Sequence, residues 1–109
     1  MLQYESLSNR LVPALYRVHK ALGPGLLENC YEEAMAVELE HLGIPFTRQQ
    51  DFPVFYRFKL IGYYTADLVV DGKIVLELKS VVKLGRNHEA QLLNYLALSG
   101  LSVGYLVIL

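Results

Sequence analysis

The sequence predicts an α/β (α+β) domain in which helices flank a mixed β-sheet, in the order α-α-β-β-β-β-α-β. Three observations support this. Apolar residues recur at helical spacing early in the chain, apolar segments rich in β-branched and aromatic residues follow, and a last helical stretch precedes an apolar strand. With 109 residues, 53% of them hydrophobic, the chain is expected to form one domain, residues 1–109, that buries roughly two thirds of its unfolded surface.

Two helices are expected at the start of the chain. Leucine and valine recur at steps of three and four residues over 6–21, where Pro13 fits only near a helix start or as a kink. Glycine and proline at 22–25 predict a stop and a sharp turn. A second helix is expected over 27–42, and Gly43 should end it.

Extended segments fill most of the remaining chain. Four are expected before the last helix: Pro45–Gln50, Val54–Leu60, Tyr63–Val70 and Ile74–Val81. Asp71-Gly72 signals a hairpin between the last two of them. Asn87 is expected to cap a helix over 88–98, and 103–109 should form a final strand.

Three charged residues interrupt the apolar pattern of the two hairpin strands. Asp67 lies on the first strand, and Glu77 and Lys79 lie on the second. Burying charge in a sheet is costly unless the charges pair or hold a metal. Both carboxylates, the Leu78 carbonyl and waters could complete an octahedral shell around Mg²⁺ (or Mn²⁺). Lys79 could then help to activate a water or stabilise charge on a phosphate, which is the chemistry of phosphodiester hydrolysis.

The metal hypothesis makes a demand on the hairpin. A two-residue loop would pair Asp67 with Leu76, so that Glu77 would point to the opposite face of the sheet. A three-residue loop, or one bulge, would instead pair Asp67 with Glu77 and put Lys79 on the same face. The spacing alone leaves both arrangements open.

Two helices offer further polar groups. Glu28 and Tyr31 are three residues apart at a helix start and share a face, so Glu28 could reach the metal through a water. The more common role of such residues is structural, with the glutamate complementing the helix dipole and the tyrosine packing. His88, Gln91 and Tyr95 form a stripe on the last helix that could contact a phosphate or the attacking water, although such a stripe is more often a solvated face.

The net charge of −1 gives no support to a nucleic-acid binder that works through overall electrostatics. Phosphate contacts would therefore have to be local, and the candidates are Lys79, Lys83, Arg86, Arg57 and Lys59. The aromatic and basic run 55–59 could stack on bases, but alternation in a half-buried strand explains it as well.

The chain is expected to be cytoplasmic and to avoid membranes. Its first ten residues carry charges where a signal peptide would need an apolar core. Residues 90–109 contain no charged residue and approach the length of a membrane span. Polar residues and glycines interrupt them, so a helix followed by a buried strand is expected there.

The segments that carry these candidates resemble those of the GxxExxY protein family, a small group within the PD-(D/E)XK nuclease superfamily. GLLENCY at 25–31 matches the family signature, and ADLVV, LELKS and HEAQLLNYL follow in the family order. The resemblance covers nearly the whole chain, and the set of motifs is specific in combination. It implies a restriction-endonuclease-like core of the order α-β-β-β-α-β, with the 45–50 segment as an edge or accessory strand.

The resemblance also implies roles for particular residues. Glu28 corresponds to the helical acidic residue of the superfamily, and Gln91 to the residue on the following helix. Asp67 and the triplet Glu77-Leu78-Lys79 correspond to the metal-binding and catalytic residues of the strands. Ala66 stands where the superfamily usually has a proline before the first aspartate.

The sequence is therefore interpreted as an Mg²⁺-dependent nuclease-like domain, with Tyr31 and Tyr95 lining its pocket. Nucleic acid is the expected partner, with DNA placed ahead of RNA, and the chain could form a homodimer. The alternative is a catalytically inactive module that keeps the nuclease fold for nucleic-acid binding or protein interaction. Intact carboxylates and a lysine argue against that alternative, because a module without a metal gains nothing from burying them.

Overall fold

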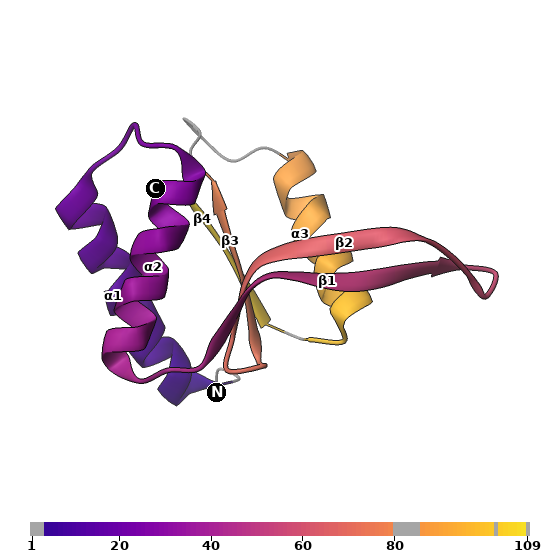
Figure 1. Ribbon diagram of the computed structural model, residues 1–109, viewed down its shortest axis with the longest axis horizontal. Helices are drawn as coiled ribbons and strands as arrows, with labels where there is room; N and C mark the ends of the chain where they lie inside the picture. The colour runs from indigo at the N-terminus through magenta and orange to yellow at the C-terminus, as the bar shows by residue number, and fades with distance from the viewer. Residues whose placement is uncertain (1–3, 80–85, 102, 109) are drawn as a thin grey trace.

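The computed structural model describes residues 4–79, 86–101 and 103–108. It contains a four-stranded mixed sheet flanked by helices, as the sequence predicts (Figure 1). The elements are, in chain order, α1 (Glu5–Leu22), α2 (Glu28–Leu42), β1 (Phe46–Tyr56), β2 (Lys59–Val70), β3 (Ile74–Lys79), α3 (Arg86–Ser99) and β4 (Val103–Ile108).

The strands follow one another in the sheet in the order β1-β2-β3-β4. β1 and β3 each run antiparallel to β2, whereas β4 runs parallel to β3. A parallel neighbour requires a crossover connection, and α3 lies in that connection. The chain therefore places α1 and α2 on one side of β3 and α3 on the other (Figure 1).

Each face of the sheet buries its own apolar cluster. Side chains of α1 and α2 pack on one face against Leu68, Leu76 and Leu78. The other face carries a smaller cluster around Val69 and Val75, which Leu92 and Leu96 of α3 partly cover. Because both faces are covered, β3 is almost entirely buried, and the charged residue Glu77 on it is 3% exposed.

The prediction of four strands before the last helix is wrong, because the residues described before α3 form three. The segments predicted at 45–50 and 54–60 belong mostly to one strand, β1, in which Pro53 is accommodated. Proline interrupts interior strands, but β1 is an edge strand and has no second neighbour that needs the missing N–H. The turn instead lies at Arg57-Phe58, with φ angles of 47° and 66°. Such angles usually call for glycine or asparagine, so the sequence gave no turn signal there.

The helix predictions are confirmed to within one or two residues at each end. Pro13 lies inside α1 without ending it. Gly43 ends α2 in the left-handed conformation, with φ 70°, and its N–H donates to carbonyls of the last turn. Residues 80 and 81 of the predicted fourth strand lie outside the described residues. None of the helices within the described ranges is both long and apolar enough to cross a membrane.

The turn between α1 and α2 is held by one buried side chain. Tyr31 is completely buried, and its hydroxyl donates to the Gly23 carbonyl at 2.6 Å and accepts from the Leu26 N–H at 3.1 Å. These bonds fix the backbone that leads into α2. They therefore set where the first turn of α2, with Glu28, lies relative to the sheet.

We expect Tyr31→Phe to lower the free energy of unfolding by about 1–2 kcal/mol, because it removes both hydrogen bonds and leaves the packing of the ring in place. Urea denaturation, monitored by circular dichroism, measures this change in the free energy of unfolding. Tyr16→Phe is the matched control, since Tyr16 on α1 is 71% exposed, and it should leave stability unchanged. Equal stabilities of the two variants would show that the hydroxyl of Tyr31 does not hold the turn.

Candidate functional site

The hairpin between β2 and β3 has the geometry that the metal hypothesis requires. The register pairs Val70 with Ile74, so the connection contains three residues, Asp71 to Lys73. Of the two arrangements that the spacing left open, the structure has the three-residue loop. In this register, Asp67 and Glu77 are the next opposed positions after Leu68 and Leu76.

Backbone pairing between β2 and β3 stops at Leu68 and Leu76, and side chains take over beyond that point. The Leu78 N–H donates to Asp67 Oδ2 at 2.9 Å, and the Asp67 N–H donates to Glu77 Oε1 at 3.4 Å. Each carboxylate thus contacts the backbone of the opposite strand. The structure brings Asp67 and Glu77 together at the point where the two strands separate.

A distortion in β1 accompanies this separation. Gln49, which would face Asp67 in the β1–β2 register, has φ 48° and is not paired with it. The β1–β2 hairpin bends away from β3 at this level (Figure 1). The bend leaves the Asp67 side chain at the edge of a depression rather than inside a continuous sheet.

Glu77 is a buried carboxylate with an unusual titration. It is 3% exposed, and the Tyr64 hydroxyl donates to its Oε1 at 2.8 Å. Burial, together with the neighbouring charge of Asp67, raises the pKa of Glu77 to about 7, although the hydrogen bond from Tyr64 acts in the opposite direction. Around neutral pH, the protein therefore binds a proton at a position where a free glutamate would be ionised.

Glu28 and Asp67 line one pocket. It lies between the first turns of α2 and the bend of the hairpin, and its walls are Glu28, Asn29, Glu32, Gln49 and Asp67. Three of these residues come from the start of α2, which the bonds of Tyr31 position. The acidic residue predicted from the helix is thus brought to the same pocket as Asp67.

Sequence reasoning missed the polar residues that hold this pocket in shape. Glu32 is buried and accepts from Arg48 Nη2 at 2.7 Å, and Gln49 Nε2 donates to its other oxygen. Arg48 Nη2 also lies 2.6 Å from Glu33 Oε1, and this contact holds the pKa of Glu33 below its usual range. One signal was available: Glu28 and Glu32 are four residues apart and share a helix face.

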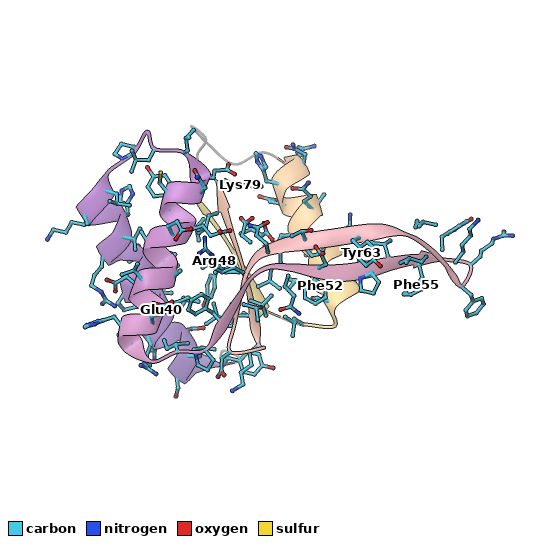
Figure 2. All side chains as sticks on the ribbon, viewed as in Figure 1. Glu40, Arg48, Phe52, Phe55, Tyr63 and Lys79 are labelled. Carbon is cyan, nitrogen blue, oxygen red and sulfur yellow. The ribbon has the colours of Figure 1, made fainter. Side chains whose placement is uncertain are left out.

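The remaining predicted site residues lie around this centre. Lys79 is partly buried at the end of β3, between the starts of α2 and α3 (Figure 2). On α3, Arg86 and Gln91 are exposed, while His88 is half-buried and has an interaction partner. Lys83 and the side chain of Tyr95 lie outside what the structure describes. Tyr31 is inside the core, so what the structure documents for it is a structural role.

The donor set fits a hard divalent cation. Asp67 and Glu77 offer carboxylate oxygens, and Mg²⁺ is commonly bound by one or two carboxylates while it keeps several waters. Within residues 4–79, 86–101 and 103–108, no three Asp, Glu, His or Cys side chains gather into a metal cage. A cation at this pair would therefore depend on backbone oxygen and water for the rest of its shell.

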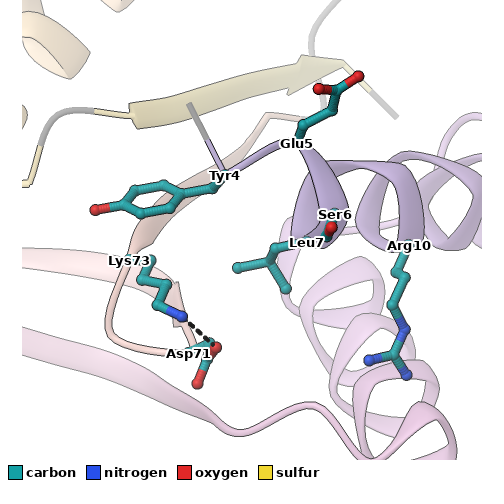
Figure 3. A pocket seen from close by; sticks show the side chains of 7 residues that line it. All are labelled: Tyr4, Glu5, Ser6, Leu7, Arg10, Asp71 and Lys73. Atoms are coloured by element: carbon teal, nitrogen blue, oxygen red, sulfur yellow. Dashed lines mark hydrogen bonds and ion pairs between the residues drawn. The ribbon is translucent and has the colours of Figure 1, made fainter. Parts of the chain in front are cut away.

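A different pocket lies where the start of α1 meets the β2–β3 loop (Figure 3). Its charged groups are engaged within the protein: Lys73 Nζ is 3.2 Å from Asp71 Oδ2, and Arg10 Nη2 donates to the Leu42 carbonyl at 2.6 Å. Lys73 Nζ also lies 5.9 Å from the centre of the Tyr4 ring. Because these cations are already paired, we place the candidate site at Asp67 and Glu77.

Comparison with known proteins identifies the family of the chain. The family model of the PD-(D/E)XK nuclease superfamily matches residues 5–108, which is nearly the whole chain. No curated protein and no solved structure matched the chain.

We expect Glu77→Gln to stabilise the metal-free protein at pH 8. The raised pKa means that the contribution of Glu77 to stability is fully present below about pH 4.5 and is lost as the pH rises through about 7. Glutamine stays neutral and can still accept the Tyr64 hydrogen bond. The gain at pH 8 should be about 3 kcal/mol, since each unit of pKa shift corresponds to about 1.4 kcal/mol, and most of it should be lost by pH 5.

Urea unfolding in EDTA at several pH values between 5 and 8 measures this difference. Glu40→Gln is the control, because Glu40 is an exposed carboxylate on α2 (Figure 2) and should show no such pH-dependent gain. A Glu77→Gln protein no more stable than the wild type at pH 8 would contradict the raised pKa.

Proposed function

The chain belongs to the PD-(D/E)XK nuclease superfamily, and we propose that it hydrolyses phosphodiester bonds of nucleic acid in a divalent-metal-dependent reaction. Within the superfamily, the GLLENCY motif at 25–31 supports assignment to the GxxExxY group. DNA is the proposed substrate ahead of RNA.

One observation carries this proposal: two carboxylates from neighbouring strands meet where β2 and β3 separate. The Leu78 N–H fixes the orientation of Asp67, and the Tyr64 hydroxyl fixes that of Glu77. Groups that orient a ligating carboxylate in this way strengthen a metal site. A purely structural core gains nothing from burying Glu77 next to a second carboxylate, and this burial together with the charge of Asp67 raises the pKa of Glu77 to about 7.

The residues that would hold Mg²⁺ or Mn²⁺ are Asp67, Glu77 and the Leu78 carbonyl. When bound, such a cation lowers the pKa of a ligated water and stabilises charge on the phosphate. Lys79 follows this set on β3, and we assign it the role of general base or electrostatic stabiliser. Glu28 lines the pocket with Asp67, where it can position a water.

Further residues are proposed to meet the substrate rather than the metal. Gln91 is an auxiliary group on α3, and His88 and Arg86 stand on the first turns of the same helix. Lys83 and Tyr95 are proposed as substrate contacts on the strength of the sequence alone. Tyr31 supports the site indirectly, because its hydroxyl holds the turn that leads to Glu28.

We expect the wild-type protein to cleave nucleic acid in Mg²⁺ or Mn²⁺ and to be inactive in EDTA. Asp67→Ala and Lys79→Ala should each reduce the rate by roughly 100-fold or more, because the first removes a metal ligand and the second removes the general base or electrostatic stabiliser. Cleavage of labelled single- and double-stranded DNA and RNA, resolved on denaturing gels, measures the rates.

Asp51→Ala is the matched control for this assay. Asp51 lies on β1 and is exposed, and its carboxylate accepts from the Thr65 hydroxyl rather than joining the site. Equal cleavage by the wild type, Asp67→Ala and Lys79→Ala would remove the catalytic proposal. A protein that binds nucleic acid and metal but cleaves nothing would instead be the inactive module.

We also expect the wild-type protein to bind Mn²⁺ in isothermal titration calorimetry, with the heat lost in Asp67→Ala and Glu77→Ala and kept in Asp51→Ala. The two site variants each remove a carboxylate from the donor set, whereas the control removes one outside it. Circular dichroism of each variant checks that the fold is intact. Unchanged binding in Asp67→Ala would place the metal elsewhere.

A further inference from the structure

The distal part of the β1–β2 hairpin stands away from the rest of the protein (Figure 1). We call residues 52–64 the arm. At its base, Phe52 and Tyr64 stack on each other, with ring centres 5.9 Å apart, in the cluster that α3 partly covers. The base is therefore anchored, while the remainder projects along the longest dimension of a molecule with extents of 46 × 30 × 25 Å (Figure 1).

The projecting part of the arm exposes large apolar side chains. Phe58 is fully exposed, and four further residues expose between 60% and 64% of their surface: Phe55, Tyr56, Ile61 and Tyr63. The sequence left open whether the run 55–59 stacks on bases or alternates in a half-buried strand. The structure has no such alternation, because every residue from 55 to 61 is exposed. Exposed aromatic residues gathered in this way typically mark an interaction surface.

The tip of the arm carries side chains where the backbone favours glycine. Arg57 and Phe58 have φ angles of 47° and 66°, and neither position is a glycine. Left-handed conformations are unfavourable for residues with a Cβ, so the turn is strained to keep an arginine and a phenylalanine at its apex. The guanidinium of Arg57 lies 5.8 Å from the centre of the Tyr56 ring. The tip of the arm thus presents a positive charge and an aromatic surface side by side.

Charge indicates which partner the arm fits. Residues 52–64 contain Arg57 and Lys59 and no acidic residue, so the arm carries +2. The whole chain carries −1, which leaves −3 on the rest of the protein. A partner that approached the whole protein would meet an acidic body, but a partner held by the arm meets positive charge. A polyanion with flat apolar surfaces matches both properties of the arm.

We propose that the arm binds single-stranded nucleic acid, with bases stacked on Phe55, Phe58 and Tyr63 and phosphates contacted by Arg57 and Lys59. Single strands expose base faces that a duplex hides, and aromatic stacking combined with nearby cations is how proteins hold them. This inference rests on the proposed function in one respect: β2 runs from the arm to Asp67, so a nucleic acid held at the tip of the arm lies roughly 30 Å from the site.

The competing occupant is a second copy of this chain. Phe55, Leu60, Ile61 and Tyr63 would offer it an apolar strip. However, pairing one arm with another would bring together two surfaces of the same charge, which opposes association. The charge of the arm therefore favours the polyanion, and self-association becomes an outcome that the experiment can detect.

Fluorescence anisotropy of the full chain with a labelled oligo-deoxythymidine of about 20 nucleotides, in EDTA, tests the proposal without any cleavage. Phe58→Ala should weaken binding roughly ten-fold, because it removes one stacking platform. Arg57→Ala should weaken binding and also reduce its dependence on salt between about 50 and 200 mM, because it removes one phosphate contact. Since both residues are exposed at the tip, neither change should affect folding.

Two controls separate this inference from the proposed catalytic function. Tyr16→Ala removes an exposed aromatic residue of α1 and should leave binding unchanged. Asp67→Ala should reduce cleavage as described above but keep oligonucleotide binding in EDTA. A wild-type protein that cleaves nothing, yet binds the oligonucleotide through Phe58 and Arg57, would support the proposal for the arm and contradict the proposed nuclease activity. Cleavage by the wild-type protein, with oligonucleotide binding that neither Phe58→Ala nor Arg57→Ala weakens, would support the nuclease activity and contradict the proposal for the arm.

The inference is overturned if the wild-type protein does not bind the oligonucleotide, or if Phe58→Ala and Arg57→Ala bind as tightly as Tyr16→Ala. Sedimentation velocity of the same proteins covers the remaining case. A wild-type dimer that Phe58→Ala converts to a monomer, with unchanged oligonucleotide binding, would show that the arm holds a second copy and would likewise overturn the proposal.

Discussion

The site depends on the way β2 and β3 separate. Backbone pairing ends at Leu68 and Leu76, and beyond it the carboxylate of Asp67 accepts from the backbone of β3 while that of Glu77 accepts from the backbone of β2. These side-chain hydrogen bonds take the place of the next backbone hydrogen bonds between β2 and β3, so the acidic pair marks the end of backbone pairing between the two strands. Moving either carboxylate would require a different register, and a slip of one residue would send Glu77 to the other face.

This arrangement has an electrostatic consequence. Burial of Glu77, together with the charge of the partly buried Asp67 beside it, disfavours the ionised form of Glu77 and raises its pKa. The hydrogen bond from Tyr64 offsets only part of this rise. Around the pocket the fold treats acidic groups differently, since the buried Glu32 is matched by Arg48 and Gln49. The positive charge of Arg48 thus balances Glu32 in the wall of the pocket. Asp67 and Glu77 have no such partner among the described residues, and a proton or a bound cation would balance their charge.

The sequence predicted the helices and the mixed sheet and singled out Asp67, Glu77 and Lys79, because hydrophobic period, glycine signals and charged residues among apolar ones are local properties. It left open whether Asp67 and Glu77 face each other. It could not decide the length of the β2–β3 loop, since Asp71-Gly72 fits a two-residue turn as well as the three-residue loop that forms. It misplaced the first hairpin because Pro53 lies in an edge strand and the turn at Arg57-Phe58 contains no glycine. The bonds of Glu32 with Arg48 and Gln49 escaped it because the residues are distant in the chain and meet only after folding.

The two places where local sequence rules failed are also the places to which we assign function. At Gln49 and Asp67 the strand pairing is broken, and the break opens the pocket that Glu28 and Glu32 line. At Arg57 and Phe58 the backbone adopts angles that suit glycine, and the strained turn presents a cation and an aromatic ring at the tip of the arm. Strain of this kind persists only where the surrounding structure enforces it, as the register of β1 and β2 does on both sides of the tip. Since β2 joins the arm to the acidic pair, one strand connects the surface that would hold a nucleic acid to the carboxylates that would act on it.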